Sequence, residues 1–202
     1  DKKIDGDIRR IQKQVFEFTL AETERAVYQG CESVIHNLNT MHSRAGAQVP
    51  FSSINYGTDT SPEGRMITKN ILLATDAGLG AGETPIFPIQ IFRVKDGVNS
   101  TAGDPNYDLF KLACKVSAKR LFPNFSFQDA SYNMALYKEG HPETEVSYMG
   151  CRTRVLANNY DKDRQIAYSR GNLSFTSINL PRIAFENKEN VGFSRANNQA
   201  IR

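Results

Sequence analysis

Residues 85–95 read PIFPIQIFRVK, and this stretch decides the fold class. Its isoleucine, phenylalanine and valine residues are typical of a buried strand. Pro88 keeps the strand short at its start, because proline cannot donate a backbone hydrogen bond within a sheet. Helical patterns stand on both sides of this strand. The sequence therefore predicts a strand between two helices, which is the repeating unit of an α/β fold.

The helix expected before this strand has well-marked ends. Ser61 is typical of a helix N-cap and Pro62 of the first helical position, and the helix is expected to end at Gly78. The stretch 78–85, GLGAGETP, is rich in glycine but follows a helix and lacks a GKS or GKT ending. We therefore interpret it as a helix C-cap and a loop, not as a phosphate-binding loop.

The rest of the chain continues this alternation. A second helix is predicted with Asp104 as its cap, Pro105 in its first turn and Arg120 at its end. Further strands are predicted at 51–56, 122–127 and 173–180. Alternating strands and helices favour an α/β fold with parallel strands joined by right-handed crossovers.

Apolar residues recur at intervals of three and four between Asp7 and Met41, which predicts two amphipathic helices or one long kinked helix. Cys31 falls on this apolar stripe, and Cys114 falls among the apolar positions of the helix that ends at Arg120. A free cysteine is among the most buried residue types, so both are expected to lie in the core.

The overall composition excludes several classes of protein. The chain has 202 residues, 40% of them hydrophobic, and a mean hydropathy of −0.47, which suits one globular domain or two. No apolar stretch approaches the roughly 20 residues that cross a membrane. The net charge is +3, with basic residues scattered among acidic ones, so nucleic-acid binding is not expected. The absence of an initiator methionine and of a secretory leader favours an excised piece of a cytoplasmic protein.

The cysteines predict neither disulfides nor a metal site. Cys31, Cys114 and Cys151 stand far apart and form no CxxC pair, so reduced thiols of a cytosolic protein are expected. The three histidines do not stand at zinc-ligand spacing from them. No metal is expected in this segment.

Residues 148–155, YMGCRTRV, place Cys151 behind a glycine and among arginines, after a long connection without periodicity. The residues alone leave four roles open. The first is a structural thiol, and the second is a protease-type nucleophile with His141 as its base. The third is a redox-reactive thiol whose pKa the arginines lower. The fourth is a thiol that becomes a sulfur radical. In the last role Gly150 would let the loop approach a substrate closely.

Five longer blocks follow one another along the chain. They are HNLNTMHSRAGAQVPFSSINYGTDTSPEGR, GAGETPIFPIQIFRVKDGVN, LFPNFSFQDAS, MGCRTRV and RGNLSFTSINLPRIAF. Together they resemble the catalytic subunit of the anaerobic (class III) ribonucleoside-triphosphate reductases, a family of glycyl-radical enzymes. The resemblance implies that residues 1–202 form one partial domain. This would be the middle part of a ten-stranded α/β barrel, made of two antiparallel five-stranded halves with a finger loop at its centre.

The resemblance also implies site residues. Cys151 matches the finger-loop cysteine that becomes a thiyl radical and takes the 3′ hydrogen of the ribonucleotide, and Met149 and Gly150 would contact the substrate. Asn172 would stand where aerobic relatives have a glutamate near the 2′ and 3′ hydroxyls. An amide there can hydrogen-bond hydroxyls but cannot act as a carboxylate base. Without the resemblance, Asn172 is equally well a turn residue before a strand.

The partners expected from the resemblance are ribonucleoside triphosphates, ATP and deoxynucleotide effectors, a radical S-adenosylmethionine activase and a second copy of the chain. No cofactor is expected within this segment. The glycyl radical, a zinc-binding cysteine cluster and a second active-site cysteine would lie outside it, with formate as the family's reductant. The isolated segment is therefore expected to be inactive. Residues 1–45 would lie at the dimer and effector surface or pack on the outside of the barrel.

Two other functions remain open beside the leading one. A nucleotide-binding regulatory or assembly module without chemistry of its own would use Asp7 to Gln48. A thiol peptidase or acyltransferase would use Cys151 with His141.

Overall fold

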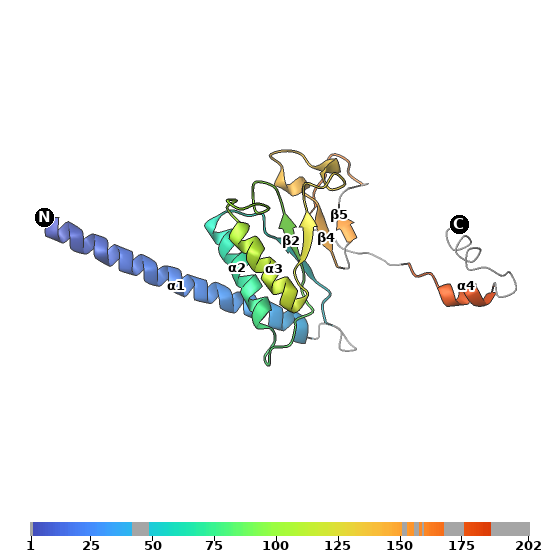
Figure 1. The fold of residues 1–202 in the computed structure, drawn as a ribbon, viewed down its shortest axis with the longest axis horizontal. Coiled ribbons are helices and arrows are strands. Elements are labelled where there is room, and N and C mark those ends of the chain that lie inside the picture. The colour runs from blue at the N-terminus through green and yellow to red at the C-terminus, as the bar shows by residue number, and fades with distance from the viewer. Residues whose placement is uncertain are drawn as a thin grey trace. The chain divides into compact units, whose positions relative to one another are not determined.

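The structure is a computed structural model, and it describes residues 2–41, 49–150, 153–155, 158, 160–167 and 176–186. The chain divides into two compact units, Asp1–Ser169 and Arg170–Arg202. The first unit contains α1 (Lys2–Thr40), β1 (Ser53–Tyr56), α2 (Pro62–Ala77), β2 (Ile89–Val94), α3 (Tyr107–Arg120), β3 (Asn124–Phe127), two short 3-10 turns (Met134–Leu136 and Pro142–Thr144), β4 (Ser147–Met149) and β5 (Thr153–Val155) (Figure 1). The second contains α4 (Leu180–Glu186).

The centre of the first unit is a three-stranded parallel sheet in the order β1-β2-β3. Ser53 pairs with Ile89, and Ile91 pairs with Asn124. The strand predicted from residues 85–95 is confirmed, and it begins directly after Pro88, where backbone donors become available for the sheet. The predicted α/β class with parallel strands is therefore confirmed for this unit.

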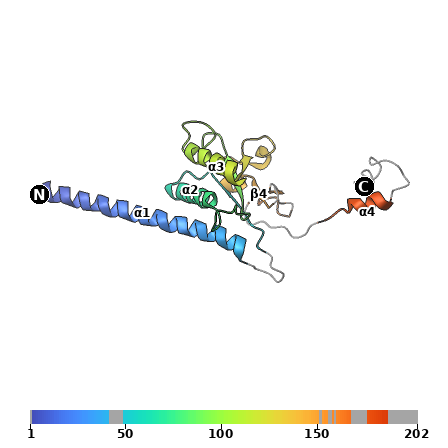
Figure 2. The same ribbon diagram turned by 60° about the horizontal axis from the view of Figure 1, so that its bottom comes forward.

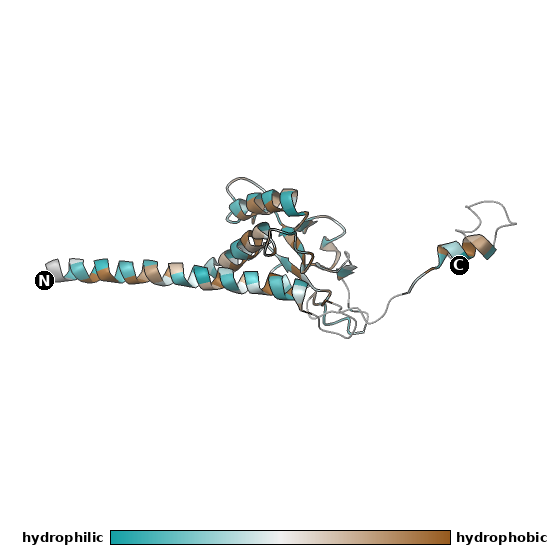
Figure 3. Cartoon of the chain, turned by 90° about the horizontal axis from the view of Figure 1, so that it is seen from below, coloured by the Kyte–Doolittle hydropathy of each residue, from teal (hydrophilic) through white to brown (hydrophobic). Residues whose placement is uncertain are grey.

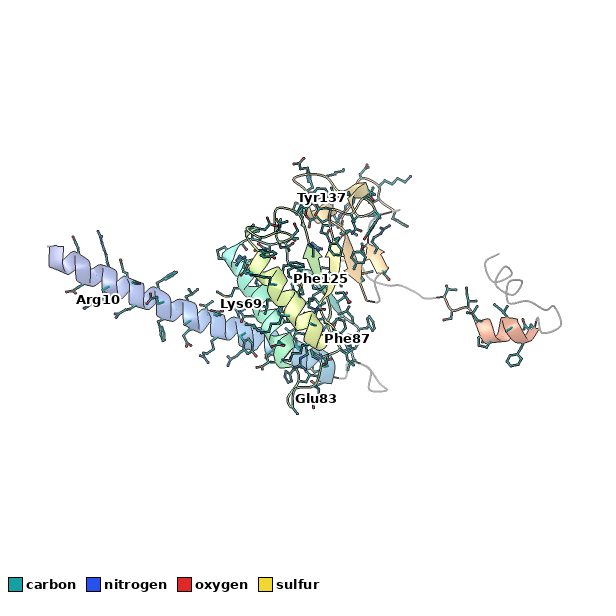
Figure 4. The ribbon with its side chains drawn as sticks, viewed as in Figure 1. Arg10, Lys69, Glu83, Phe87, Phe125 and Tyr137 are labelled. Atoms are coloured by element: carbon teal, nitrogen blue, oxygen red, sulfur yellow. The ribbon has the colours of Figure 1, made fainter. Side chains whose placement is uncertain are left out.

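One face of the sheet carries the apolar core. Phe92 and Val94 of β2 are buried against Leu72 of α2 and against Leu109, Ala113 and Val116 of α3. Phe125 packs at the edge of this cluster, in the position labelled in Figure 4. Both helices therefore cover the same side of the sheet, as Figure 1 shows.

The ends of α2 lie where the sequence predicts them. The Oγ of Ser61 accepts a hydrogen bond from the backbone N–H of Gly64 at 3.1 Å, and Pro62 is the first helical residue. Gly78 closes the helix with a positive φ of 82°, which glycine adopts readily because it has no Cβ. The stretch 78–85 is a loop, as expected.

The start of α3 was predicted wrongly. The helix begins at Tyr107, and Asn106 takes the capping position without a side-chain cap bond. The Asp104 carboxylate instead accepts from the backbone N–H of Thr101 at 2.8 Å. The amide of Asn106 is buried and donates to the carbonyl oxygens of Gly57 and Asp59, so a contact with distant chain sets the start of the helix.

The two cysteines expected in the core have different surroundings. Cys31 is buried beside Ile35, Ile71 and Ala74, and its burial raises the pKa of the thiol. Cys114 is exposed, so that prediction was wrong. Ala113 and Val116 point into the core, and a residue one position after Ala113 is rotated about 100° away from that face.

The N-terminal pattern forms one continuous helix, α1, of 39 residues. Only its later part packs on α2, through Cys31 and Ile35 and through an ion pair of 2.6 Å between Glu24 and Lys69 (Figures 2 and 4). Hydrophilic and hydrophobic residues alternate along it (Figure 3). Large apolar side chains of its earlier part are exposed: Ile8, Ile11, Val15, Phe16, Phe18 and Leu20. Of the helices that the structure describes, none combines the length and apolar character of a membrane span.

The strand predicted at 173–180 was wrong where it can be checked. Residues 176–179 have no regular structure, α4 begins at Leu180, and residues 173–175 lie outside the described ranges. The Oδ1 of Asn179 accepts from the backbone N–H of Arg182 at 2.9 Å, and Pro181 suits a first helical turn. These local helix-start signals outweigh the β-propensity of the residues before them.

Candidate active-site face

The sheet face opposite the helices is polar. Successive residues of a strand point to opposite faces, so Phe92 and Val94 face the core while Ile91, Arg93 and then Lys95 face the other way. On the neighbouring strands, Asn55 and Ser126 share that second face with Arg93. The segment that ends in β4 lies across this face and is held there by contacts of Glu145, Ser147 and Tyr148. We call this surface the polar face.

Two charge contacts between half-buried cations and a buried carboxylate join β2 to the residues before β4. The Nζ of Lys95 lies 2.5 Å from the Oε1 of Glu145, and the Nη1 of Arg93 lies 3.5 Å from its Oε2. The Nη2 of Arg93 also donates to the Oγ of Ser147 at 2.5 Å. The Lys95 ammonium lies 3.4 Å from the hydroxyl of Tyr137, which is labelled in Figure 4. The carboxylate of Glu145 is therefore shared by two cations.

The pKa values of these cations follow from their surroundings. Burial lowers the pKa of Arg93, against the opposing charge of Glu145. Burial also works to lower the pKa of Lys95, but the hydrogen bond and charge of Glu145 outweigh it and the pKa is raised. The Nε of Arg93 is buried without a hydrogen-bond partner among the described residues. Glu145 therefore favours the charged form of Lys95, while burial works against the charged form of Arg93.

A hairpin follows this charged cluster. β4 and β5 are antiparallel, with Met149 paired to Thr153, so the chain between these strands is three residues long and includes Cys151. Gly150 has a φ of 47°. A Cβ at this position would lie 2.9 Å from the Cε1 of Phe51, so both the backbone conformation and the close contact favour glycine.

Backbone groups of β4 bind side chains of β1. The Nδ2 of Asn55 donates to the carbonyl oxygen of Tyr148 at 2.8 Å, and the N–H of Tyr148 donates to the Oδ1 of Asn55 at 3.0 Å. The N–H of Gly150 donates to the Oγ of Ser53 at 3.3 Å. Tyr148 of β4 and Gly150, which follows β4, are thus tied to the polar face by their backbones.

A pocket opens on the polar face beside β4. Its volume is about 270 Å³, and it runs along β3, with a lining of Ile91, Asn124, Phe125, Ser126, Phe127, Tyr132 and Tyr148. Hydroxyl and amide groups next to aromatic rings suit a ligand that carries both hydroxyls and a flat ring. The space beside Lys95 and Glu145 measures about 10 Å³, which is near the minimum for one water molecule. On the polar face, the 270 Å³ pocket is therefore the candidate ligand site.

The sequence-predicted site residues are only partly described. Met149 ends β4 and Gly150 follows it at the edge of the polar face. Cys151 and Asn172 lie outside the described residues, so their roles stay predictions. Asn55 and Glu145 were missed by sequence reasoning. The one local signal was Arg93, a charged residue within the apolar stretch 89–94.

His141 has a neighbour of its own. Its Nδ1 lies 2.9 Å from the Oε1 of Glu143, on an exposed turn. A backbone hydrogen bond, followed by the contact with His141, lowers the pKa of Glu143. A pairing of His141 with Cys151 stays a prediction. Among the described residues, no three His, Cys, Asp or Glu side chains gather as metal ligands would.

A second pocket lies between α1 and the loop after α2. Its volume is about 540 Å³, and Glu32, Ser33, His36 and Asn37 line it from the helix. Gly78 and Gly80 line it from the loop. Its helix side falls within residues 1–45, for which the resemblance implies either an effector surface or packing on the outside of the barrel, and that expectation stays a prediction.

Comparison with known proteins gives the family. Residues 6–200 match the sequence model of the anaerobic ribonucleoside-triphosphate reductases. The anaerobic ribonucleoside-triphosphate reductase of Salmonella typhimurium is 36% identical over 172 residues, which are 85% of this chain and 23% of that protein. The Escherichia coli protein of that name is 36% identical over 169 residues, which are 83% of this chain and 23% of that protein. The phage T4 protein is 38% identical over 170 residues, which are 84% of this chain and 27% of that protein.

The chain thus spans about a quarter of the length of these curated relatives. The blocks that carry the resemblance at the level of sequence lie within the matched residues. Because the match runs through nearly the whole chain, this protein belongs to the anaerobic ribonucleoside-triphosphate reductase family.

Proposed function

We propose that this chain is the part of an anaerobic ribonucleoside-triphosphate reductase that presents the reacting cysteine to the ribonucleotide. The observation that carries the proposal is the attachment of β4, which leads directly to Cys151, to the polar face beside the 270 Å³ pocket. The names of the relatives support reduction of ribonucleoside triphosphates as the reaction of the complete protein.

The proposed step is the transfer of one hydrogen atom. Cys151, as a thiyl radical, takes the hydrogen atom from C3′ of the ribose, so that an S–H bond forms, the C–H bond breaks and the unpaired electron moves to C3′. The sulfur must lie in contact with this carbon and away from water. Gly150, with its left-handed backbone and its close contact with Phe51, suits a chain that turns tightly at this point.

The pocket supplies the groups that would hold the sugar. The side chains of Asn124, Ser126 and Tyr148 offer hydrogen bonds to hydroxyl groups, and the ring of Tyr132 offers a flat apolar surface. Met149 would contact the substrate from β4. Asn172 is proposed to bind the 2′ and 3′ hydroxyls through its amide.

The sheet is proposed to be part of a ten-stranded barrel with the polar face inside. β1 and β3 each pair on one side only among the described residues, and such edges call for further strands. The glycyl radical would supply the unpaired electron from a part of the protein outside this segment, together with the zinc-binding cysteines. Formate as reductant, a radical S-adenosylmethionine activase and a homodimer complete the proposal.

The proposal is tested with Cys151→Ser in the complete enzyme. We expect no deoxynucleotide formation with an undiminished glycyl-radical signal in electron paramagnetic resonance, because a serine O–H bond is too strong to exchange hydrogen in the same way. Cys114→Ser is the matched control, since this thiol is exposed on α3 and should be dispensable. Turnover by Cys151→Ser would refute the proposal.

A second candidate is a nucleotide-binding regulatory module, which the 540 Å³ pocket between α1 and the loop 78–85 favours. In that case the complete protein would bind deoxynucleotides through residues such as His36 and Ser33 but would carry out no reduction through Cys151. Equilibrium binding with Ser33→Ala and Cys151→Ser separates the candidates. If Ser33→Ala loses nucleotide binding while Cys151→Ser keeps its turnover, the regulatory function is favoured.

A further inference from the structure

The backbone edge of β4 that faces away from β5 is covered by side chains of β1 instead of by another strand. In an antiparallel pair, alternate residues turn both backbone groups toward the partner strand. The backbone groups of Tyr148 and Gly150 face away from β5, because they bind the side chains of Asn55 and Ser53. Ser147 and Met149 are the alternate residues, whose backbone groups face β5. The side chain of Asn55 thus takes the place of a neighbouring strand.

The asparagine amide suits this place because it offers one donor and one acceptor, as a peptide unit does. The two bonds between Asn55 and Tyr148 measure 2.8 Å and 3.0 Å and span 93 positions of sequence. Ser53 lies two residues before Asn55 on the same face of β1 and accepts from Gly150 at 3.3 Å. β1 therefore holds residues 148 and 150 at two successive points.

We propose that Asn55, with Ser53 in support, is a positioning residue for Cys151: its amide fixes the backbone of β4 and so sets where the sulfur meets the ribose. The inference rests on the proposed function of Cys151. Gly150, the last described residue with such a bond, directly precedes Cys151 in the sequence, so the anchors end one peptide unit before the cysteine. One peptide unit leaves little chain to absorb a displacement of β4 before the cysteine.

The other contacts of this segment hold different atoms. Arg93 binds the Ser147 side chain, and the Tyr148 hydroxyl donates to the Oδ1 of Asn133 at 3.0 Å. Both fix side chains at positions before Gly150. Within the described residues, Asn55 and Ser53 are the β1 side chains that hydrogen-bond to the backbones of Tyr148 and Gly150, so their loss frees this edge while the side-chain contacts remain.

The chain offers a matched control. Asn39 also holds a backbone with its amide, because its Nδ2 donates to the carbonyl oxygen of Phe87 at 2.6 Å and its Oδ1 accepts from the N–H of Phe87 at 3.0 Å. Both asparagines are half-buried. Asn39→Ala thus removes the same kind of contact from the segment before β2, whose Phe87 ring lies 5.0 Å from the ring of Phe51, and leaves the bonds to the backbones of Tyr148 and Gly150 in place.

The experiment compares Asn55→Ala with Asn39→Ala in the complete, activated enzyme. We expect kcat to fall about 10-fold to 100-fold in Asn55→Ala, since a misplacement of about 1 Å can cost that much, with KM and the glycyl-radical signal unchanged. Asn39→Ala should keep its kcat. Asn55→Asp, which keeps the acceptor and loses the donor, should lie near Asn55→Ala.

Hydrogen–deuterium exchange gives a readout that does not depend on turnover. Asn55→Ala should speed exchange at the amide of Tyr148, and Ser53→Ala should speed exchange at the amide of Gly150 alone with a fall of a few-fold in kcat. If Asn55→Ala does not fold, the milder Ser53→Ala decides. Equal kcat in the Asn55 and Asn39 variants, or unchanged exchange, would overturn the inference. Turnover by Cys151→Ser would instead refute the proposed function and leave the exchange result standing.

Discussion

Lys95 and Glu145 bind each other at 2.5 Å and join the end of β2 to the segment that enters β4. Glu145 is nearly fully buried, with 7% of its side chain exposed, and it also faces Arg93. Glu145→Gln would leave two partly buried cations without a counter-charge. Removing one partner of a buried ion pair costs about 3 kcal/mol or more, so we expect the melting temperature of the complete protein to fall.

The control for this prediction is Glu143→Gln, two residues earlier. Glu143 is 39% exposed and pairs with His141 on the surface, where ion pairs contribute little. The melting temperature of the Glu143→Gln protein should equal that of the wild type. Equal melting temperatures for the two variants would show that the Lys95–Glu145 contact does not stabilise the fold.

The buried hydroxyl of Tyr56 predicts a loss of stability at high pH. Burial raises the pKa of Tyr56 well above its ordinary value of about 10. Above that value the unfolded chain releases the proton and the folded chain keeps it, so the folded state binds more protons and stability falls as pH rises. The contribution of Tyr56 to the free energy of unfolding is fully present below about pH 10. Above that pH, one such group lowers the free energy of unfolding by up to about 1.4 kcal/mol per pH unit.

Tyr56→Phe should flatten this alkaline loss in unfolding experiments between pH 8 and pH 11. It should also lower stability at neutral pH by about 1 kcal/mol, because the hydroxyl donates to the Oε1 of Gln90 at 2.6 Å. Tyr160→Phe, at a fully exposed position, should leave the slope unchanged. Lys95, whose pKa is also raised, adds to the loss of stability at a pH above its ordinary pKa. Because Lys95 is intact in both variants, its contribution does not affect their comparison. Identical slopes in wild type and Tyr56→Phe would contradict the prediction.

Gly150→Ala should impair the protein more than Gly80→Ala. Both glycines have left-handed backbones, with φ of 47° and 41°, and such a conformation costs an alanine about 1 kcal/mol. A Cβ at Gly80 meets no atom within 4 Å, whereas one at Gly150 meets the ring of Phe51 at 2.9 Å. We therefore expect a larger loss of stability for Gly150→Ala than for Gly80→Ala, and a loss of turnover for Gly150→Ala.

The contact with Phe51 can be removed separately. In the double variant Gly150→Ala with Phe51→Ala, stability should recover toward that of Phe51→Ala alone, as a double-mutant cycle measures. Additive effects of the two substitutions would mean that the ring does not restrict the glycine.

The thiols of Cys31 and Cys114 should react at different rates with a maleimide. Cys114 is exposed on α3, while Cys31 is 9% exposed between α1 and α2. Burial raises the pKa of both thiols, so access of the reagent sets the difference. Mass spectrometry of peptides from the native complete protein should show early labelling at Cys114 and labelling at Cys31 only on unfolding. Equal rates would mean that α1 does not stay packed on α2.

Local signals predicted the helices and strands that neighbouring residues determine. Ser61, Pro62 and Gly78 mark both ends of α2 because capping acts within one turn. The start of α3 was missed because Asn106 binds Gly57 and Asp59, nearly 50 positions earlier. Cys114 was misplaced because its spacing from the core residue Val116 does not follow a helical face.

The candidate site was predictable only in part for the same reason. Arg93 carries a local signal, a charge within an apolar strand, but Asn55 carries none, since its role depends on a strand 93 positions away. The family was predicted from blocks of sequence and is confirmed by the comparisons. The roles of Cys151 and Asn172 follow from that resemblance and stay predictions.

The two faces of the sheet share their strands, and this limits how the sequence can change in length. Phe92 belongs to the core and Arg93 to the polar face, one position apart in β2. An inserted or deleted residue between Pro88 and Phe92 would exchange the two faces for the rest of the strand, burying a guanidinium among aromatic rings and turning a phenyl group toward the ligand. Substitutions in β2 can be compensated one at a time, but a shift of its frame would destroy the core and the site together.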